Sequence, residues 1–187
     1  GIQIIAGASG FYQLANLNED ERIAFVENLK DLAYADIILI DTGAGVSPNV
    51  LTFLRGADDA IIITTPEPTA ITDAYGIIKS ISTEMNGPNI RLVVNRVNSI
   101  MEGKRVSDRV INIAGQFLNI KVNNLGFVFE DSVVKRAVVK QDPFIRSAPN
   151  SKASQSIRHL MSRLANIEYQ ESGGFGRFLK GLFGGKL

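Results

Sequence analysis

Four consecutive apolar residues, Ile37 to Ile40, end in an acid, and this segment constrains the fold more than any other. A short, uninterrupted apolar run is typical of a strand that is buried on both faces, as in a parallel sheet. Asp41 follows directly, and Gly45 completes an Asp-x-x-x-Gly pattern. A carboxylate at the C-terminal end of such a strand lies where open α/β sheets bind ligands. The segment therefore predicts a strand at 36–41 with a ligand site at its end.

Asp41 and Gly45 suit two tasks at a phosphate-binding site. The carboxylate can hold Mg²⁺, usually through water, while the glycine lets a backbone N–H approach a terminal phosphate. We interpret the pair as the catalytic, metal-and-sensor half of a nucleotide-hydrolysing site. The phosphate-binding pattern Gly-x-x-x-x-Gly-Lys-Ser/Thr does not occur in the 187 residues, and the first residue is not Met. We therefore expect that an N-terminal P-loop segment is missing from this chain.

Short apolar runs alternate along the chain with segments whose apolar residues follow a helical period. This alternation predicts βαβ units, and thus an α/β fold with a mostly parallel sheet and helices on both faces. The expected strands span 3–6, 36–41, 60–65, 90–95 and 124–129, and the expected helices span 19–33, 69–85, 104–118, 132–140 and 151–165. Because parallel strands bring their C-terminal ends together, we expect Asp41, Pro66 and Asn95 at one edge of the sheet.

Composition excludes several classes of site. The chain has no cysteine and one histidine, His159, which rules out disulfides, Cys-zinc sites, iron–sulfur ligation and a histidine metal cluster within it. The net charge is +1, but acidic residues predominate up to Tyr75 and basic residues after it. This split favours an anionic partner for the second half, either a membrane surface or nucleic acid, unless the two halves simply attract each other.

Residues at the expected strand ends carry further chemistry. Ser47 and Pro48 suit the start of a short helix that runs toward Leu54. Glu67 lies between two prolines on a stiff loop, and Thr69 is the expected cap of the next helix.

The side-chain amide of Asn95 offers a donor and an acceptor together, which matches the edge of adenine. Asparagine is also a common turn residue, so this position has a purely structural alternative.

In this order, the segments resemble the MinD/ParA class of P-loop ATPases, most closely its flagellar-number regulators of the FlhG, FleN and YlxH-like type. The resemblance extends over nearly the whole chain. The segments that carry it are 41–45 (Asp-Thr-Gly-Ala-Gly), 64–69 (Thr-Thr-Pro-Glu-Pro-Thr), 72–75 (Thr-Asp-Ala-Tyr), 94–96 (Val-Asn-Arg), 130–131 (Glu-Asp) and 141–143 (Gln-Asp-Pro).

The resemblance implies a role for each matching residue. Asp41 is similar to the switch II acid near Mg²⁺, and Gly45 is similar to the γ-phosphate sensor. The implied residues around the nucleotide base are Asn95, Arg96, Phe129, Glu130 and Asp131. Glu67 and Asp73 resemble positions that face a second subunit or couple nucleotide state to partners. Phe129 departs from the family, which usually has proline there.

The C-terminal segment predicts a membrane anchor. Five apolar residues follow one helical face, flanked by basic residues. The set comprises Phe175, Phe178, Leu179, Leu182 and Phe183, with Arg177 and Lys180 beside them. We expect a partial ATPase domain at 1–166, a linker at 167–174 and a membrane-targeting amphipathic tail at 175–187. The alternative is a terminal helix packed on the domain.

Together these features predict an ATP-dependent, membrane-associating ATPase that regulates flagellar number or placement, with ATP and Mg²⁺ as cofactors. The resemblance implies an ATP-dependent homodimer, flagellar assembly proteins such as FlhF as partners, and a cytoplasmic location on the inner face of the plasma membrane. This chain alone is expected to be inactive, because it lacks the P-loop.

Two other functions remain open. One is a scaffold of the same fold that no longer hydrolyses ATP. The other is a DNA-partition ATPase with Lys104, Arg105 and Arg109 on phosphates, although nucleic acid is the less favoured partner.

Overall fold

In the computed structural model, the described residues are 1–5, 20, 24, 27–28, 30–43, 45, 47–83 and 87–165. The chain divides into two compact units, one with Gly1–Asp58 and the other with Asp59–Met85 and Asn89–Glu171. The expected linker and amphipathic tail, at 167–187, lie outside the described residues.

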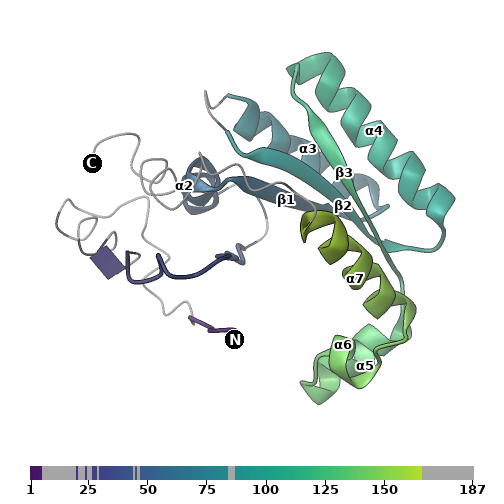
Figure 1. Cartoon of the computed structure of the whole chain (residues 1–187). Helices are drawn as coiled ribbons and strands as arrows, with labels where there is room; N and C mark the ends of the chain where they lie inside the picture. The colour runs from purple at the N-terminus through teal and green to yellow at the C-terminus, as the bar shows by residue number, and fades with distance from the viewer. Residues whose placement is uncertain are drawn as a thin grey trace. The chain divides into compact units, whose positions relative to one another are not determined.

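The second unit is built on a parallel three-stranded sheet in the order β1-β2-β3 (Figure 1). Its strands are β1 (Asp59–Thr64), β2 (Asn89–Val97) and β3 (Val122–Phe129), close to three of the expected runs. Helices α3 (Pro68–Ser82) and α4 (Ile100–Leu118) connect successive strands. The predicted α/β fold with a parallel sheet is therefore confirmed.

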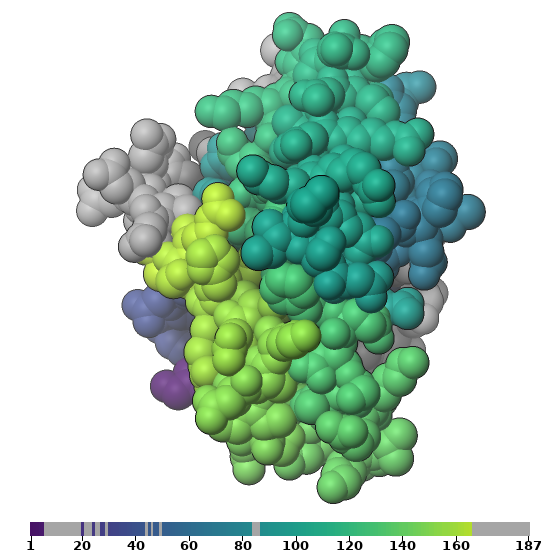
Figure 2. All heavy atoms as spheres, turned by 90° about the vertical axis from the view of Figure 1, so that its right-hand side faces the viewer, coloured from purple at the N-terminus to yellow at the C-terminus, as the bar shows by residue number. Residues whose placement is uncertain are grey.

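Helices pack against both faces of the sheet at its central strand, β2. On one face, Val94 and Val97 of β2 pack with Val106 of α4. On the other, Val93 packs with residues of α7 (Lys152–Ala165), including Leu160. Neighbouring strand residues point to opposite faces, so a strand covered on both sides needs an unbroken apolar run. In the space-filling view, the yellow-green atoms of α7 lie against the green β3–α5–α6 segment (Figure 2).

Helix ends in the second unit follow capping chemistry. Ser99 caps α4 by accepting the Glu102 N–H at 3.1 Å, and the helix ends at Asn119 in the left-handed conformation. Helix α5 (Ser132–Lys140) has the expected bounds and ends at left-handed Gln141. The short α6 (Phe144–Ser147) was not predicted, because four residues after a proline carry no periodic pattern.

Thr69 does not cap α3, contrary to expectation. The helix begins at Pro68, with Glu67 at the N-cap position. Proline suits the first helical position because its fixed φ is helical and it has no N–H to satisfy. The cap therefore falls one residue before Pro68, which puts Thr69 inside the helix.

In the first unit, helix α2 (Pro48–Gly56) confirms the expected start, with the Ser47 hydroxyl accepting the Val50 N–H at 3.3 Å. Within the expected helix 19–33, the described residues 20, 24, 27, 28 and 30 are helical, and residues 31–34 form a turn.

Residues 36–41 do not form the expected strand. Of the strand expected at 3–6, residues 3–5 are described, and they do not form a strand either. Ile37 and Leu39 are 70% and 83% exposed rather than buried. An apolar run becomes a strand only where a neighbour accepts its backbone hydrogen bonds, and the described sheet pairs only β1, β2 and β3. The prediction of a strand buried on both faces was therefore wrong here.

Two glycines of α4 give a matched test of packing. A Cβ on Gly103 would lie 2.7 Å from ring carbons of Phe127 on β3, whereas nothing lies within 4 Å of a Cβ on Gly115. We expect Gly103→Ala to destabilise the protein by roughly 1–3 kcal/mol through overpacking. Gly115→Ala should stabilise it by about 0.5–1 kcal/mol, because alanine favours the helix interior. Urea unfolding measures the free energy of unfolding of both variants. A change of the same sign in both would contradict the packing described for Gly103 and Gly115.

Candidate functional site

The C-terminal ends of β1, β2 and β3 surround one pocket of about 540 Å³. Its position agrees with the rule that open parallel sheets bind ligands beyond the carboxyl ends of their strands. Pro66 lines this pocket together with Arg96, whereas Asn95, which was expected to meet Pro66 at this edge, precedes Arg96 in the chain and is not among the lining residues. The lining residues are Thr65, Pro66, Glu67, Pro68, Arg96, Asn98 and Glu130.

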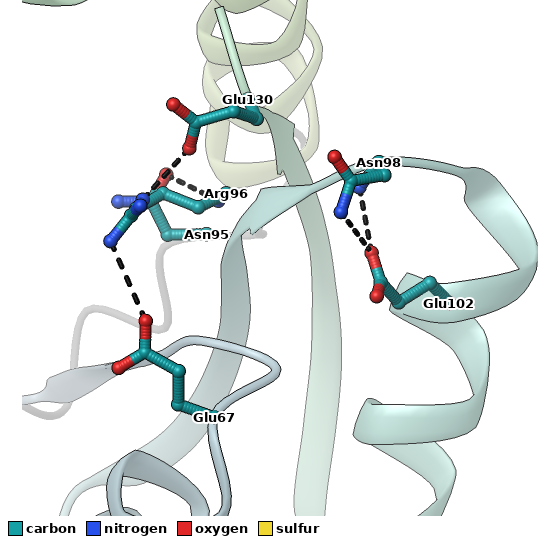
Figure 3. A network of polar contacts seen from close by, with 6 residues as sticks. All are labelled: Glu67, Asn95, Arg96, Asn98, Glu102 and Glu130. Carbon is teal, nitrogen blue, oxygen red and sulfur yellow. Dashed lines mark hydrogen bonds and ion pairs between the residues drawn. The ribbon is translucent and has the colours of Figure 1, made fainter.

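Arg96 lies between two carboxylates at this edge (Figure 3). Its Nε donates to Glu130 Oε2 at 2.8 Å, and its Nη1 lies 3.6 Å from Glu67 Oε1. The hydrogen bond to Glu130 and the charge of that carboxylate raise the pKa of the guanidinium. Arg96 is 54% exposed in its side chain, so these pairs contribute little to stability and act mainly on geometry.

A β-bulge places Asn95 and Arg96 beside the pocket. Val94 pairs with Phe127 and Val97 with Phe129, so two residues of β2 face the single residue between these partners on β3. Bulges often occur beside functional sites, where they redirect a side chain. Asn95 Oδ1 accepts the Arg96 backbone N–H at 2.9 Å, which fixes the orientation of the half-buried amide.

Phe129, the last residue of β3, and Glu130, the first residue after it, lie in different environments. Phe129 is half-buried and packs against the cluster of Val94, Val97 and Val106. Glu130 reaches the pocket, and its N–H donates to the Val97 carbonyl at 3.0 Å. This backbone hydrogen bond ties the end of β3 to the end of β2.

Asp131 joins the N-termini of two helices. Its Oδ1 accepts the Val133 N–H of α5 at 3.0 Å, and its Oδ2 accepts the Ala153 N–H of α7 at 3.3 Å. The hydrogen bond from Val133, with others from Ala153 and Lys152 and the charge of Arg136, lowers the pKa of Asp131. A predicted base-contacting residue is therefore also a helix cap on both oxygens.

The lowered pKa makes a stability prediction with a definite sign. A carboxyl whose pKa falls on folding stabilises the protein above its unfolded pKa, about 3.9 for aspartate. That stabilisation is lost as the pH falls through the folded pKa. We expect the melting temperature of the parent to exceed that of Asp131→Asn at pH 7, with the difference shrinking below about pH 4. Thermal unfolding across this range tests it, and a pH-independent difference would contradict it.

The other predicted site residues lie apart from the pocket or in the first unit. Asp73 is exposed on α3. Asp41 and Gly45 belong to the first unit, where Asp41 is exposed and Gly45 has φ +87°, which suits glycine. Their predicted meeting with Asn95 stays a prediction. Among the described residues, no three carboxylate or histidine side chains gather closely enough to hold a metal.

Sequence reasoning missed Asn98 and its partner Glu102. The Glu102 Oε2 accepts the Asn98 backbone N–H at 2.7 Å and its side-chain amide at 3.2 Å. The signal was present, because Ser99 followed by Glu102 is a capping-box pattern. Asn98 is thereby held at the rim of the pocket (Figure 3).

Carboxylates outnumber cations around this pocket, while amide and hydroxyl groups supply neutral hydrogen-bonding partners. A phosphate would be repelled by Glu67 and Glu130. A neutral group with donors and acceptors, such as a nucleotide base or ribose, suits the arrangement better.

Over the described part of the chain, no helix has the length and apolarity needed to cross a membrane.

Comparisons with known proteins agree with the predicted class. The chain is 27% identical to the antiactivator FleN of Pseudomonas aeruginosa, over 88% of the chain and 59% of that protein. It is 33% identical to the flagellum site-determining protein YlxH of Helicobacter pylori, over 89% and 56% respectively. It is 36% identical to the septum site-determining protein MinD of Bacillus subtilis, over 69% and 47%. No protein-family model matches.

These relatives, together with the parallel sheet, show that the chain belongs to the MinD/ParA class of ATPases. Within that class, the chain is similar to the antiactivator FleN and to the flagellum site-determining protein YlxH. It spans about half the length of the curated relatives it matches.

Proposed function

We propose that the protein is an ATP-dependent, MinD-like ATPase that regulates flagellar number or placement. In this proposal, the second unit supplies the base-binding side of the nucleotide site. The observation that carries it is the convergence of Glu67, Arg96, Asn98 and Glu130 on one pocket at the carboxyl edge of a parallel sheet. The similarity to the flagellum site-determining protein YlxH supports the flagellar assignment.

Within this proposal, Asn95 reads adenine, and Glu130 and Asp131 shape the loop beside the base. Asp41 holds Mg²⁺ through water, and the Gly45 N–H contacts the terminal phosphate. One carboxylate suffices on the protein side, because Mg²⁺ usually completes its octahedron with water and substrate phosphates. The bound ion would supply charge stabilisation to the phosphates.

The proposal extends to assembly and location. ATP favours a homodimer through surfaces that include Glu67 and Asp73, both of which are exposed on the second unit. The dimer binds an anionic membrane through its C-terminal tail, on the inner face of the plasma membrane. Flagellar assembly proteins, FlhF among them, are the proposed partners. These steps rest on the family resemblance and on the pattern of the tail sequence.

The experiment is nucleotide binding by the protein expressed from its complete reading frame. We expect ATP to bind more tightly than GTP, and Asn95→Ala to weaken ATP binding by about tenfold, the value of one lost hydrogen bond. Asn112→Ala is the matched control, because Asn112 is exposed within α4, whereas Asn95 precedes the pocket-lining Arg96 in the bulge of β2. Flagella per cell, counted in a strain without the gene, test the biological role. Normal counts, or no nucleotide binding, would reject the proposal.

The DNA-partition alternative has one observation in its favour: Lys104, Arg105 and Arg109 are all exposed on α4. A DNA-binding protein would lose affinity steeply with salt as counterions return to the phosphates. Salt-sensitive binding to DNA, together with no binding to liposomes, would favour this function. A scaffold that has lost turnover would instead bind ATP without hydrolysing it.

A further inference from the structure

Two valines near the end of α5 are largely exposed to solvent. Val138 and Val139 are 70% and 85% exposed, whereas their neighbour Ala137 is buried. Exposed apolar side chains are common on protein surfaces, so the valines alone carry no function. The informative feature is the set of charged residues around them.

Cations surround Val139 on the outward face of α5. Lys135 and Arg136 precede it by four and three residues, a spacing that places side chains next to each other on a helix. Lys140 follows it directly, and all three cations are exposed. Among the described residues, none of the three is in an ion pair with a carboxylate, although the charge of Arg136 acts on Asp131. Their charge is therefore largely available to a partner.

The positive charge extends from α5 into α6 and the start of α7. Residues 132–158 contain six basic residues and one acidic residue, Asp142, which is half-buried. Arg146 of α6 is exposed, and α6 packs against α5. Both helices lie beyond the end of β3, at one extremity of the second unit (Figure 1). We define the α5–α6 surface as Lys135, Arg136, Val138, Val139, Lys140 and Arg146.

An anionic membrane fits both features of the α5–α6 surface. The cations match lipid phosphates, and the boundary between headgroups and acyl chains offers an apolar environment to the exposed valines. Nucleic acid would satisfy the cations, but its phosphates give the valines no apolar partner. A protein partner would need acidic and apolar groups at matching positions, whereas a fluid bilayer offers both to any basic and apolar surface.

We propose that the α5–α6 surface is a second membrane contact, which binds anionic phospholipid headgroups and inserts Val139 into the interface. This contact goes beyond the C-terminal tail, because it belongs to the folded second unit. Two valines and a few cations bind a membrane weakly on their own. Joined to the tail in one chain, the contact raises the overall affinity and determines which side of the second unit faces the bilayer.

Charge substitutions test the contact against a matched pair. The measurement is the partition of the protein from the complete reading frame, with ATP, onto phosphatidylcholine vesicles with and without phosphatidylglycerol. Lys135→Gln with Arg136→Gln should lower the affinity for the anionic vesicles by about 20-fold, since each cation near an anionic leaflet adds about fivefold. Lys104→Gln with Arg105→Gln makes the same change in exposed neighbours on α4. This control should have little effect, because salt screens charges that lie away from the bilayer.

The apolar part of the contact predicts a gain of binding. Val139→Phe enlarges an exposed side chain, so it should tighten binding to the anionic vesicles by about threefold through the added buried area. Val139→Ser should weaken binding by a similar factor. Melting temperatures show that each variant is folded. Unchanged affinity in both folded variants would overturn the insertion of Val139.

The outcomes separate this contact from the proposed tail anchor. A parent whose binding falls in Phe178→Glu but not in the double substitution at Lys135 and Arg136 overturns this contact alone. Equal losses in the α4 pair would show diffuse charge attraction, which also overturns it. Binding of duplex DNA or polyglutamate that the α5 pair abolishes, with vesicle binding unchanged, would assign the surface to another partner. A parent that binds no anionic vesicles overturns this contact and the proposed membrane association together.

Discussion

Replacing Asp41 with alanine is expected to lower ATP hydrolysis by about 100-fold, the usual effect of removing one group that stabilises transition-state charge. The carboxylate is proposed to hold Mg²⁺, so its loss would remove the charge stabilisation that the ion would supply during phosphoryl transfer. Asp41 is exposed, with no place in the packed core, so the fold should persist. The expected signature is a large fall in kcat with an unchanged melting temperature.

The measurement is steady-state phosphate release by the protein from the complete reading frame. Asp31→Ala is a matched control, because Asp31 is an exposed aspartate of the same unit that lies in a turn. The control should retain the parental rate. Parental turnover in Asp41→Ala would refute the switch II assignment and leave Gly45 without a catalytic partner.

The second large effect is expected at the C-terminus, where the tail should carry membrane binding. Complete burial of one apolar side chain would stabilise the membrane-bound state by roughly 1.5–3 kcal/mol. Five partly buried side chains would therefore offset the entropy cost of ordering a short helix. Arg177 and Lys180 would each add about 1 kcal/mol near an anionic leaflet. A segment this short gives reversible binding, which a dimer strengthens by presenting two tails.

Sedimentation with anionic liposomes tests the tail. We expect Phe178→Glu to reduce the bound fraction through a loss in affinity of at least about tenfold, because it replaces a buried ring with a charge. A chain that ends at Ser172 should not sediment. Substitution of Lys180 alone should have a smaller effect, since one cation contributes less than the apolar face. Equal binding by all variants would exclude the tail as the anchor.

Local patterns were enough to predict most of the second unit. The apolar runs at β1, β2 and β3 and the helical period of α5 depend on neighbours a few residues away, so they can be recognised directly in the sequence. Ser47 and Pro48 mark the start of α2 for the same reason, since capping involves a single turn. The position of Asn95 at a strand end follows from the strand assignment.

The failed strand at 36–41 shows the limit of such patterns. Its four apolar residues satisfy the composition of a buried strand, but a strand also needs a hydrogen-bonding neighbour, which a local pattern does not specify. The apolar run of β1 also shows that a local pattern does not specify burial. Ile62 is buried, whereas Ile63 is 64% exposed, although the two are equivalent in the sequence pattern.

The sequence by itself determined the class of fold, the strand ends and the identities of the polar residues placed there. Only the tertiary structure decided how those residues meet. Glu67, Arg96 and Glu130 come from three separate strand ends, and their pairing follows from the order and register of the sheet. The bulge at Asn95 and the left-handed turn at Arg96 arise because β3 offers one residue where β2 has two. Register and backbone strain depend on contacts between distant segments, so no local pattern contains them.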